Sequence, residues 1–325
     1  MRHFEFHKKN IILALFLPFL LWTVFAACER NRANLNENTA LSVVTTIFPP
    51  YDFVRAIAGD EAVRLTMLLK PGAESHSYEP TPQDIIAIQR CDVFIYVGGE
   101  SENWVNRVLD SLDPAVLANK RLVRLMDCVE VVEEEIVEGM EEADDEEEGI
   151  ALDEHVWTSP QNAKRIVEKI TAALCEAAPT NAALYREKAA AYIAELETLD
   201  AEFRAIAASG RRKTLVFADR FPFRYFTATY GLDYYAAFPG CSTETEANAA
   251  TVAFLINKIR GEQIPVVFHI EFSNGRMADA IGEATGAKKR LLHSAHNVSR
   301  DELGAGITYL DIMRSNADVL REALQ

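Results

Sequence analysis

The sequence predicts an α/β protein of two βα domains with parallel sheets, joined by one long rigid helix. Three observations predict it. Short apolar segments alternate with amphipathic helical segments from Leu41 onward, the alternation resumes after residue 209, and a long segment rich in Ala, Glu and Leu separates the two halves. Strands that alternate with helices pair in parallel, and the helices cover the faces of the sheet.

The first half, residues 41–180, contains four strand-like segments. They are LSVVTTIF before a helix near 51–58, VRLTMLL before a helix at 82–89, DVFIYVG before the helical SENWVNRVLDSL, and RLVRLMD before an acidic loop. The helix at 82 is expected to begin after Thr81, because Thr caps helix N-termini well and Pro fits the first helical position. A capped helix that begins at SPQNAKRI completes this half.

Residues 181–209 are expected to form the connecting helix, which spans about 40 Å at about 1.5 Å per residue. The second half, residues 210–325, has the strand-like segments KTLVFAD, DYYAAF, IPVVFHIEF and KRLLHSA, and helical segments in TETEANAATVAFLINKIRG, in GRMADAIGEATG and at 301–324. Ligands of open α/β sheets bind outside the carboxyl ends of the strands. The predicted site therefore lies in the cleft between the domains.

Residues 1–28 are typical of a lipoprotein signal peptide. Basic residues precede the apolar run IILALFLPFLLWTVFAAC, which ends in small residues and Cys28. A membrane-spanning anchor fits less well, because the run is short and Pro18 interrupts it. We expect an exported protein that a lipid on Cys28 anchors to the bacterial cell membrane, with residues 29–40 as a flexible tether.

The formal charge of −16 argues against nucleic acid as a partner. This charge is concentrated: 14 of the 49 acidic residues lie in the loop 130–154, which contains no Lys or Arg, and the remainder balances 35 acids against 33 bases. The acidic loop either raises the cation concentration near the cleft or is a disordered, solvated segment. The sequence leaves both alternatives open.

Histidines at loop positions indicate metal binding. His76 follows a strand-like segment, His155 precedes a helix start, and His293 ends the segment KRLLH. Neutral imidazole is a common ligand of Zn²⁺, and three such residues from both halves could converge on one cleft. Any single loop histidine is more often a hydrogen-bonding surface residue. His269, which alternates within a strand, and His296, in a turn, are expected beside the metal without bonding to it.

Four segments resemble the zinc/manganese ABC-transporter solute-binding lipoproteins across nearly all of the mature chain. They are TTIFPPYDFVRAIAGD, LLKPGAESHSYEPTPQDI, CDVFIYVGGESENWVNRVLDSL and DEHVWTSPQNAKRI. The resemblance implies two βα domains bridged by one long helix. It also implies that His76 and His155 are the first two metal ligands.

The second half departs from the family pattern. The third-ligand position, usually His or Glu, corresponds to Arg220, whose guanidinium has no lone pair to donate to a metal. Asp219 is a candidate replacement, and Arg220 is expected beside the site, paired with Asp219 or Glu271 or holding an anion bound with the metal. The fourth-ligand position implies His293, and Glu271 and Cys241 are further candidates to complete the shell.

The resemblance implies an extracytoplasmic receptor that captures Zn²⁺ and delivers it to an ABC permease with a separate ATPase subunit. Imidazole ligands favour Zn²⁺, whereas two carboxylates would suit Mn²⁺ better. The chain has no P-loop for a nucleotide, and we expect no catalysis. Two alternatives stay open. The first is a zinc-dependent surface hydrolase with Glu271 or Asp219 as general base, although the sequence has no His-Glu-x-x-His motif. The second is an adhesin or receptor that no longer binds metal, because Arg220 stands at a ligand position.

Overall fold

The computed structural model describes residues 40–59, 63–75, 77–140, 152–242 and 247–325. Residues 42–325 form one compact unit. The signal peptide with Cys28, most of the tether, and the predicted ligand His76 lie outside the described residues. No described helix combines the length and hydrophobicity that crossing a membrane requires. The predicted domain boundaries stay predictions.

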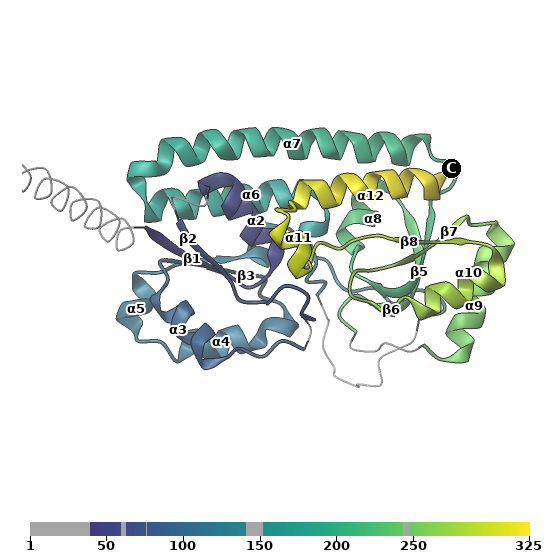
Figure 1. Ribbon diagram of the computed structural model, residues 1–325, viewed down its shortest axis with the longest axis horizontal. Helices are drawn as coiled ribbons and strands as arrows, with labels where there is room; N and C mark the ends of the chain where they lie inside the picture. Colours follow the sequence, from purple (N-terminus) through teal and green to yellow (C-terminus); the bar gives the residue numbers. More distant parts are fainter. Residues whose placement is uncertain (1–39, 60–62, 76, 141–151, 243–246) are drawn as a thin grey trace, which may run out of the picture. The chain divides into compact units, whose positions relative to one another are not determined.

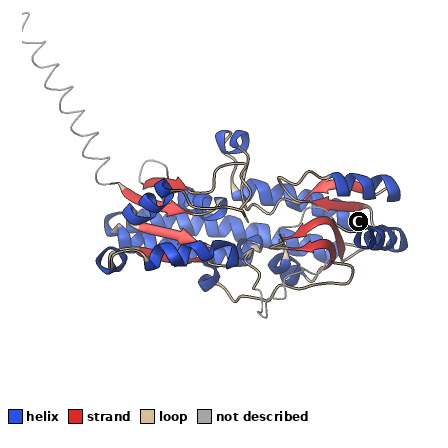
Figure 2. Ribbon diagram, turned by 90° about the horizontal axis from the view of Figure 1, so that it is seen from below, coloured by secondary structure: helices blue, strands red, loops and turns tan. Residues whose placement is uncertain are grey.

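Two four-stranded sheets form the framework of the unit (Figure 1), and Figure 2 shows them as two separate groups of strands. The N-terminal sheet has the order β2-β1-β3-β4 and the C-terminal sheet the order β6-β5-β7-β8. The strands are β1 Leu41–Thr45, β2 Val63–Met67, β3 Val93–Tyr96, β4 Arg121–Arg124, β5 Thr214–Phe221, β6 Asp233–Pro239, β7 Val266–His269 and β8 Lys288–Leu291. The pairs β1–β3, β3–β4, β5–β6, β5–β7 and β7–β8 are parallel, which confirms the predicted fold class.

Helices follow most strands, as the alternation predicted. They are α2 Phe48–Ala58, α3 Pro82–Arg90, α4 Asn103–Asp110, α5 Pro114–Ala118, α6 Pro160–Ala177, α7 Ala182–Ser209, α8 Arg224–Tyr230, α9 Ala249–Glu262, α10 Arg276–Thr285, α11 Arg300–Gly304 and α12 Tyr309–Leu324. Thr81 caps α3 in a capping box with Asp84, and Pro82 is the first helical residue. This helix start was predicted from the sequence.

The predicted long helix is α7, which has 28 residues. It packs against α2 and α6 of the first half and against α12 at the C-terminus (Figure 1). Its buried side chains recur every three to four residues and so form one apolar face. They are Tyr185, Ala189, Tyr192, Leu196, Leu199, Phe203, Ile206 and Ala207.

The expectation of a single terminal helix over 301–324 was wrong. The chain forms α11 and α12 with a break between them, where Gly306 has a φ of 80° and Thr308 caps α12 in a capping box. The break has a tertiary cause. The Tyr309 N–H at the start of α12 donates a 2.7 Å hydrogen bond to the buried Asp52 carboxylate of α2. A continuous helix would direct that N–H to its own fourth preceding carbonyl.

Part of the acidic loop is built into the structure. Glu133 and Leu152 form an antiparallel bridge at the base of the loop, and Glu135 lies 3.2 Å from Arg224 of α8 in an ion pair. Residues 141–151 lie outside the described residues. The loop therefore docks its first part on the C-terminal sheet and its neighbours, which the charge pattern did not predict.

Glu102, just before α4, is a buried carboxyl group that bonds the backbone after β3. Its Oε2 accepts the N–H of Val97 at 2.6 Å and that of Gly98 at 3.0 Å. Burial, together with the nearby Glu154, raises the pKa of Glu102 to about 7, although the Thr46 side chain and the two backbone N–H groups act in the opposite direction. The charged form is therefore disfavoured in the folded chain.

The Glu102→Gln substitution should raise the free energy of unfolding above that of the wild type by more at alkaline pH than at acidic pH. The folded chain holds the Glu102 proton up to about pH 7, whereas the unfolded carboxyl releases it near pH 4.5. The wild-type free energy of unfolding therefore falls, relative to that of the variant, as pH rises between these values, by up to about 3 kcal/mol. Urea unfolding at pH 5 and pH 8 measures this difference. The exposed Glu100→Gln is the control, and equal pH slopes for wild type and Glu102→Gln would contradict the prediction.

Candidate functional site

A small cavity of about 20 Å³ lies at the carboxyl ends of strands from both sheets. Loops after β2, β5, β6, β7 and β8 and the loop before α6 line it. Its polar side chains are Glu74, Ser75, His155, Arg220, Glu271, Ser294, His296 and Asn297. The volume is enough for about one water-sized particle. A groove of about 470 Å³ between α6 and α7 is larger, but its surface is mostly apolar and no histidine lines it. The small cavity is therefore the stronger candidate for a cation site.

His155 lies in the cavity wall with its ring fixed by a carboxylate. Its Nδ1 is 3.3 Å from Oδ1 of the buried Asp153, which also accepts the His155 N–H at 2.8 Å. A carboxylate only accepts, so Nδ1 carries a proton, and in the neutral ring the lone pair is on Nε2. Burial by itself lowers the pKa of His155, but the carboxylates of Asp153, Glu154 and Glu134 outweigh it and raise the pKa above 6.5.

A glycine allows this placement. A Cβ atom at Gly240, which follows β6, would stand 3.2 Å from Cε1 of His155 and 2.9 Å from the carbonyl oxygen of Phe221. A larger residue would therefore push the imidazole ring out of its position. Gly240 lies in the segment FPGCSTE, in which the sequence analysis considered only the cysteine.

His296 reaches the same cavity from the opposite sheet. Its ring centroid is 5.6 Å from that of His155 and 4.8 Å from that of the buried Trp157. Its Nδ1 is 3.2 Å from the hydroxyl of Ser75, which belongs to the loop after β2. The structure thus brings together His155, predicted as a ligand, and His296, predicted only to lie beside the metal.

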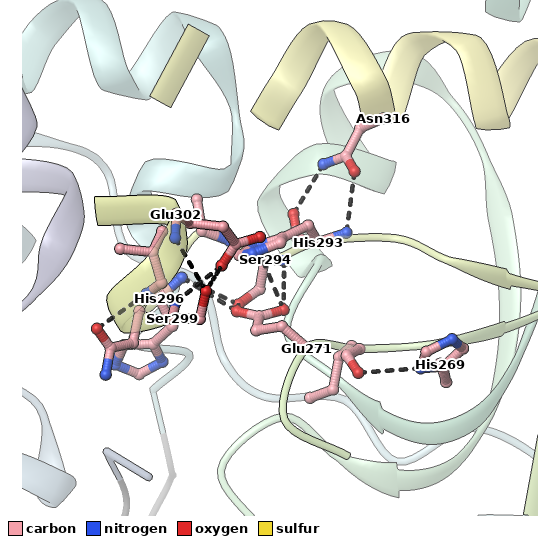
Figure 3. Close-up of polar contacts among 12 residues, drawn as sticks. His269, Glu271, His293, Ser294, His296, Ser299, Glu302 and Asn316 are labelled. Atoms are coloured by element: carbon pink, nitrogen blue, oxygen red, sulfur yellow. Dashed lines mark hydrogen bonds and ion pairs between the residues drawn. The ribbon is translucent and has the colours of Figure 1, made fainter. Parts of the chain in front are cut away.

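His293 has a different position and different contacts (Figure 3). It does not line the cavity. Its backbone N–H and carbonyl both bond to the side chain of Asn316, at 2.9 and 2.7 Å. Its Nδ1 accepts the Ala295 N–H at 2.9 Å, closer than the 3.5 Å to Glu271 Oε2. The neutral ring then carries its proton on Nε2, so His293 supports the turn in which Ala295 has a φ of 61° and which presents His296.

The carboxylates that the sequence suggested as further ligands are engaged by the protein itself. Glu271 accepts the Ser294 N–H at 2.8 Å, the Ser294 hydroxyl at 2.5 Å and the His296 N–H at 3.2 Å (Figure 3). The buried Asp219 accepts the N–H groups of Arg220 and Ile270, at 2.9 and 3.3 Å. Both groups therefore hold backbone segments at the ends of β5 and β7.

Cys241 also lies outside the cavity lining. Its N–H donates to Glu134 at 2.8 Å. Burial raises the pKa of its thiol well above 9.0, and the carboxylates of Glu134, Glu154 and Asp153 raise it further. The thiol stays protonated, which disfavours it as a ligand. All four cysteines of the described residues are free thiols.

Arg220 lies at the end of β5, just after an irregularity in the strand. Phe217 pairs with Ala236 of β6, but Arg220 pairs with Phe238, so the register shifts between the two pairs. The Arg220 guanidinium donates to Glu74 through Nη2 to Oε2 at 3.0 Å and through Nη1 to Oε1 at 3.4 Å. The expected pairing with Asp219 or Glu271 does not occur, since the guanidinium binds a carboxylate from the other sheet's loop.

The ligand set predicted from the sequence stays a prediction, because His76 lies outside the described residues. Among the described residues, no three His, Cys, Asp or Glu side chains lie close enough together to hold a metal ion. His269 ends β7 with its Nδ1 near the Ile270 carbonyl at 3.1 Å, away from the cavity lining. Glu74 and Asp153 were not predicted as site residues from the sequence. Each is two residues before a predicted ligand, and this spacing is the signal that could have indicated them.

A family model described as zinc-uptake complex component A, periplasmic (ZnuA), matches residues 43–323. The chain belongs to the ZnuA family. It is 30% identical over 313 residues to the high-affinity zinc uptake system protein ZnuA of Bacillus subtilis, covering 95% of this chain and 97% of that protein. It is 29% identical over 310 residues to the zinc-binding lipoprotein AdcA of Streptococcus pneumoniae, covering 95% of this chain but only 60% of AdcA.

Solved structures share the ZnuA-family fold. The metal-dependent lipoprotein YcdH of Bacillus subtilis has a TM-score of 0.74 at 30% identity, covering 88% of this chain and 100% of that chain. The Zn(II)-bound ZnuA-like domain of Streptococcus pneumoniae AdcA has a TM-score of 0.72 at 27% identity, covering 88% of this chain and 99% of that chain. The two-sheet architecture is therefore that of the family.

One buried amide fixes the loop after β2 against the segment that carries His296. Asn297 is 2% exposed, and its Nδ2 donates to the carbonyls of Lys70 and Ala73 at 2.8 and 2.9 Å. Beside it, the Gly72 N–H donates to the Val298 carbonyl at 2.8 Å. These bonds set the position from which Glu74 and Ser75 reach the cavity.

Asn297→Ala should lower the free energy of unfolding by about 2–3 kcal/mol, because it leaves two carbonyl groups without their buried donor. Urea denaturation of the mature protein at neutral pH measures the loss. The matched control is Asn274→Ala, an exposed asparagine whose Oδ1 accepts the nearby Arg276 N–H, with an expected loss below about 1 kcal/mol. Equal losses in the two variants would show that Asn297 does not anchor the loop.

Proposed function

We propose that this ZnuA-family protein captures Zn²⁺ outside the cytoplasm and delivers it to an ABC permease whose ATPase is a separate subunit. One observation carries the proposal: the imidazoles of His155 and His296 face one cavity at the carboxyl ends of strands from both sheets. The Asp153 carboxylate on Nδ1 of His155 is the arrangement that orients metal-binding histidines. The names of the relatives, zinc uptake protein and zinc-binding lipoprotein, support zinc as the cargo.

The proposed ligands are His155, His296 and the sequence-predicted His76. His296 takes the role that the sequence analysis gave to His293, because His296 lines the cavity and His293 bonds the backbone of its own turn. Three imidazoles favour Zn²⁺ over Mn²⁺, which prefers oxygen ligands.

The protein is proposed to bind its cation without catalytic turnover. A zinc hydrolase needs a general base within hydrogen-bonding reach of the metal-bound water. The two candidates, Glu271 and Asp219, instead accept bonds from Ser294 and from backbone N–H groups. Neither carboxylate is poised to take a proton from a bound water. A metal-free adhesin is the second candidate, and only Arg220 in the cavity wall favours it.

Substitution of His155 or His296 by Ala should lower Zn²⁺ affinity by about 100-fold or more, since each change removes an imidazole from the cavity. His293→Ala should lower the affinity less, by about tenfold, because it acts only through the turn. Competition titration of the purified mature protein against a chromogenic zinc chelator measures these affinities.

His269→Ala is the matched control and should bind Zn²⁺ like the wild type, because His269 does not line the cavity. Thermal melts of the metal-free variants exclude unfolding as the cause of weak binding. A larger loss with His293→Ala than with His296→Ala would restore the sequence-based ligand set. A wild-type protein that binds no zinc would refute the proposed function.

Anchoring by a lipid on Cys28 is proposed from the signal peptide, and the lipoprotein named among the relatives supports it. In cells that express the full chain, Cys28→Ala should abolish incorporation of a labelled fatty acid into the protein. The control is Cys128→Ala, which changes a cysteine of the folded unit and should leave the label in place. Label that persists in Cys28→Ala would disprove anchoring at this residue.

A further inference from the structure

The ion pair of Arg220 and Glu74 crosses the cavity. Arg220 extends from β5 of the C-terminal sheet, and Glu74 lies in the loop after β2 of the N-terminal sheet. The two side chains make two parallel N–H to O contacts, at 3.0 and 3.4 Å. The Arg220 side chain is 10% exposed and that of Glu74 is 40% exposed. The guanidinium is thus largely withdrawn from water while the carboxylate stays partly exposed, and a two-point contact of this kind is stronger than a single-point pair at the surface.

Glu74 is the carboxylate in the cavity wall that pairs with a cation, and its Oε1 also accepts the N–H and hydroxyl of the adjacent Ser75 at 3.1 and 3.5 Å. The other one, Glu271, accepts three bonds from Ser294 and His296 that hold the turn at the end of β8. Glu271 could turn toward a cation only by releasing that turn. Glu74 could do so by exchanging one positive group, the guanidinium, for another, because its bonds to Ser75 are local to its own loop and hold no other segment.

The cavity is too small for water to separate the charges. Its volume of about 20 Å³ holds about one water-sized particle, and Arg220 is part of its wall. A divalent cation between His155 and His296 would therefore lie near the guanidinium with little solvent between them, so their repulsion would be only weakly screened.

We propose that Arg220 is an internal competitor of the captured cation. In the ion-free protein its guanidinium holds Glu74, and a divalent cation enters the cavity as Glu74 leaves the guanidinium and bonds to the cation. The remaining positive charge of Arg220 then weakens the bound state and speeds release of the ion. This role rests on the proposed function and adds a residue that sets affinity without being a ligand.

The test compares Arg220→Gln with wild type by chelator competition and by stopped-flow release of Zn²⁺ to a chelator. Arg220→Gln should bind Zn²⁺ about tenfold more tightly or better and release it correspondingly more slowly, because a neutral side chain neither repels the cation nor competes for Glu74. Arg220→Lys keeps the charge but loses the planar fork, and it should remain within about threefold of wild type.

The matched control is Arg224→Gln. Arg224 lies four residues further along the chain, pairs with Glu135 at 3.2 Å and does not line the cavity. Its substitution should leave the zinc affinity unchanged. If Arg220→Gln does not fold, as judged by its thermal melt, Arg220→Met provides the same neutral replacement with an apolar side chain.

Glu74→Gln in the Arg220→Gln background tests the second half of the proposal. The double variant should bind Zn²⁺ about tenfold more weakly than Arg220→Gln alone, because the amide is a poorer ligand than the carboxylate. An unchanged affinity would show that Glu74 does not bond to the cation and would overturn this step.

The outcomes separate the two proposals. If wild type binds Zn²⁺ and Arg220→Gln binds equally or more weakly, the competitor role is refuted while the proposed function stands. If neither wild type nor any Arg220 variant binds Zn²⁺, the proposed function fails and the competitor role fails with it.

Discussion

Parallel strand pairing is the constraint on which the rest of the structure depends. In both sheets the paired strands run in the same direction, so the loops after them leave from one edge of each sheet. Those edges supply the polar side chains of the cavity: Glu74 after β2, Arg220 at the end of β5, Glu271 after β7 and His296 after β8. Antiparallel pairing would send half of these loops to the opposite edge. The strand topology therefore decides which loops meet at the site, and the side chains on those loops decide its chemistry.

The segment after β8 connects the two halves of the unit. Asn316 and the His293 ring fix its backbone from the C-terminal side, and Asn297 bonds the loop after β2 from the other. The indole N–H of Trp157 donates to the Ser294 carbonyl at 2.8 Å. A few residues therefore position His296 relative to both His155 and Glu74, so a change in this segment would alter the whole cavity.

Groups of opposite charge lie on the two sides of the cavity. On one side, His155 lies among the carboxylates of Asp153, Glu154 and Glu134, which raise its pKa despite burial. On the other side, Arg220 contributes a permanent positive charge and forms an ion pair with Glu74. A capture protein must bind its ion and later release it. The cavity has a carboxylate-supported imidazole on one side and a fixed guanidinium on the other.

The sequence by itself determined the fold class, the long helix and the family, because strand–helix alternation, apolar periodicity and short motifs are local properties of the chain. It also indicated His155, whose motif precedes a helix start. Only the tertiary structure showed that His296, and not His293, lines the cavity. The two lie three residues apart in a turn, and the Ala295 N–H on His293 Nδ1 directs one ring to the backbone while the other faces the cavity. The sequence likewise could not predict that Arg220 pairs with Glu74, because the two are 146 residues apart and meet only where the two sheet edges meet. The break before α12 also has a long-range cause, since the buried Asp52 carboxylate of α2 accepts the N–H of Tyr309, the first residue of α12. Local patterns set the elements, and long-range contacts between loops set the chemistry of the cavity.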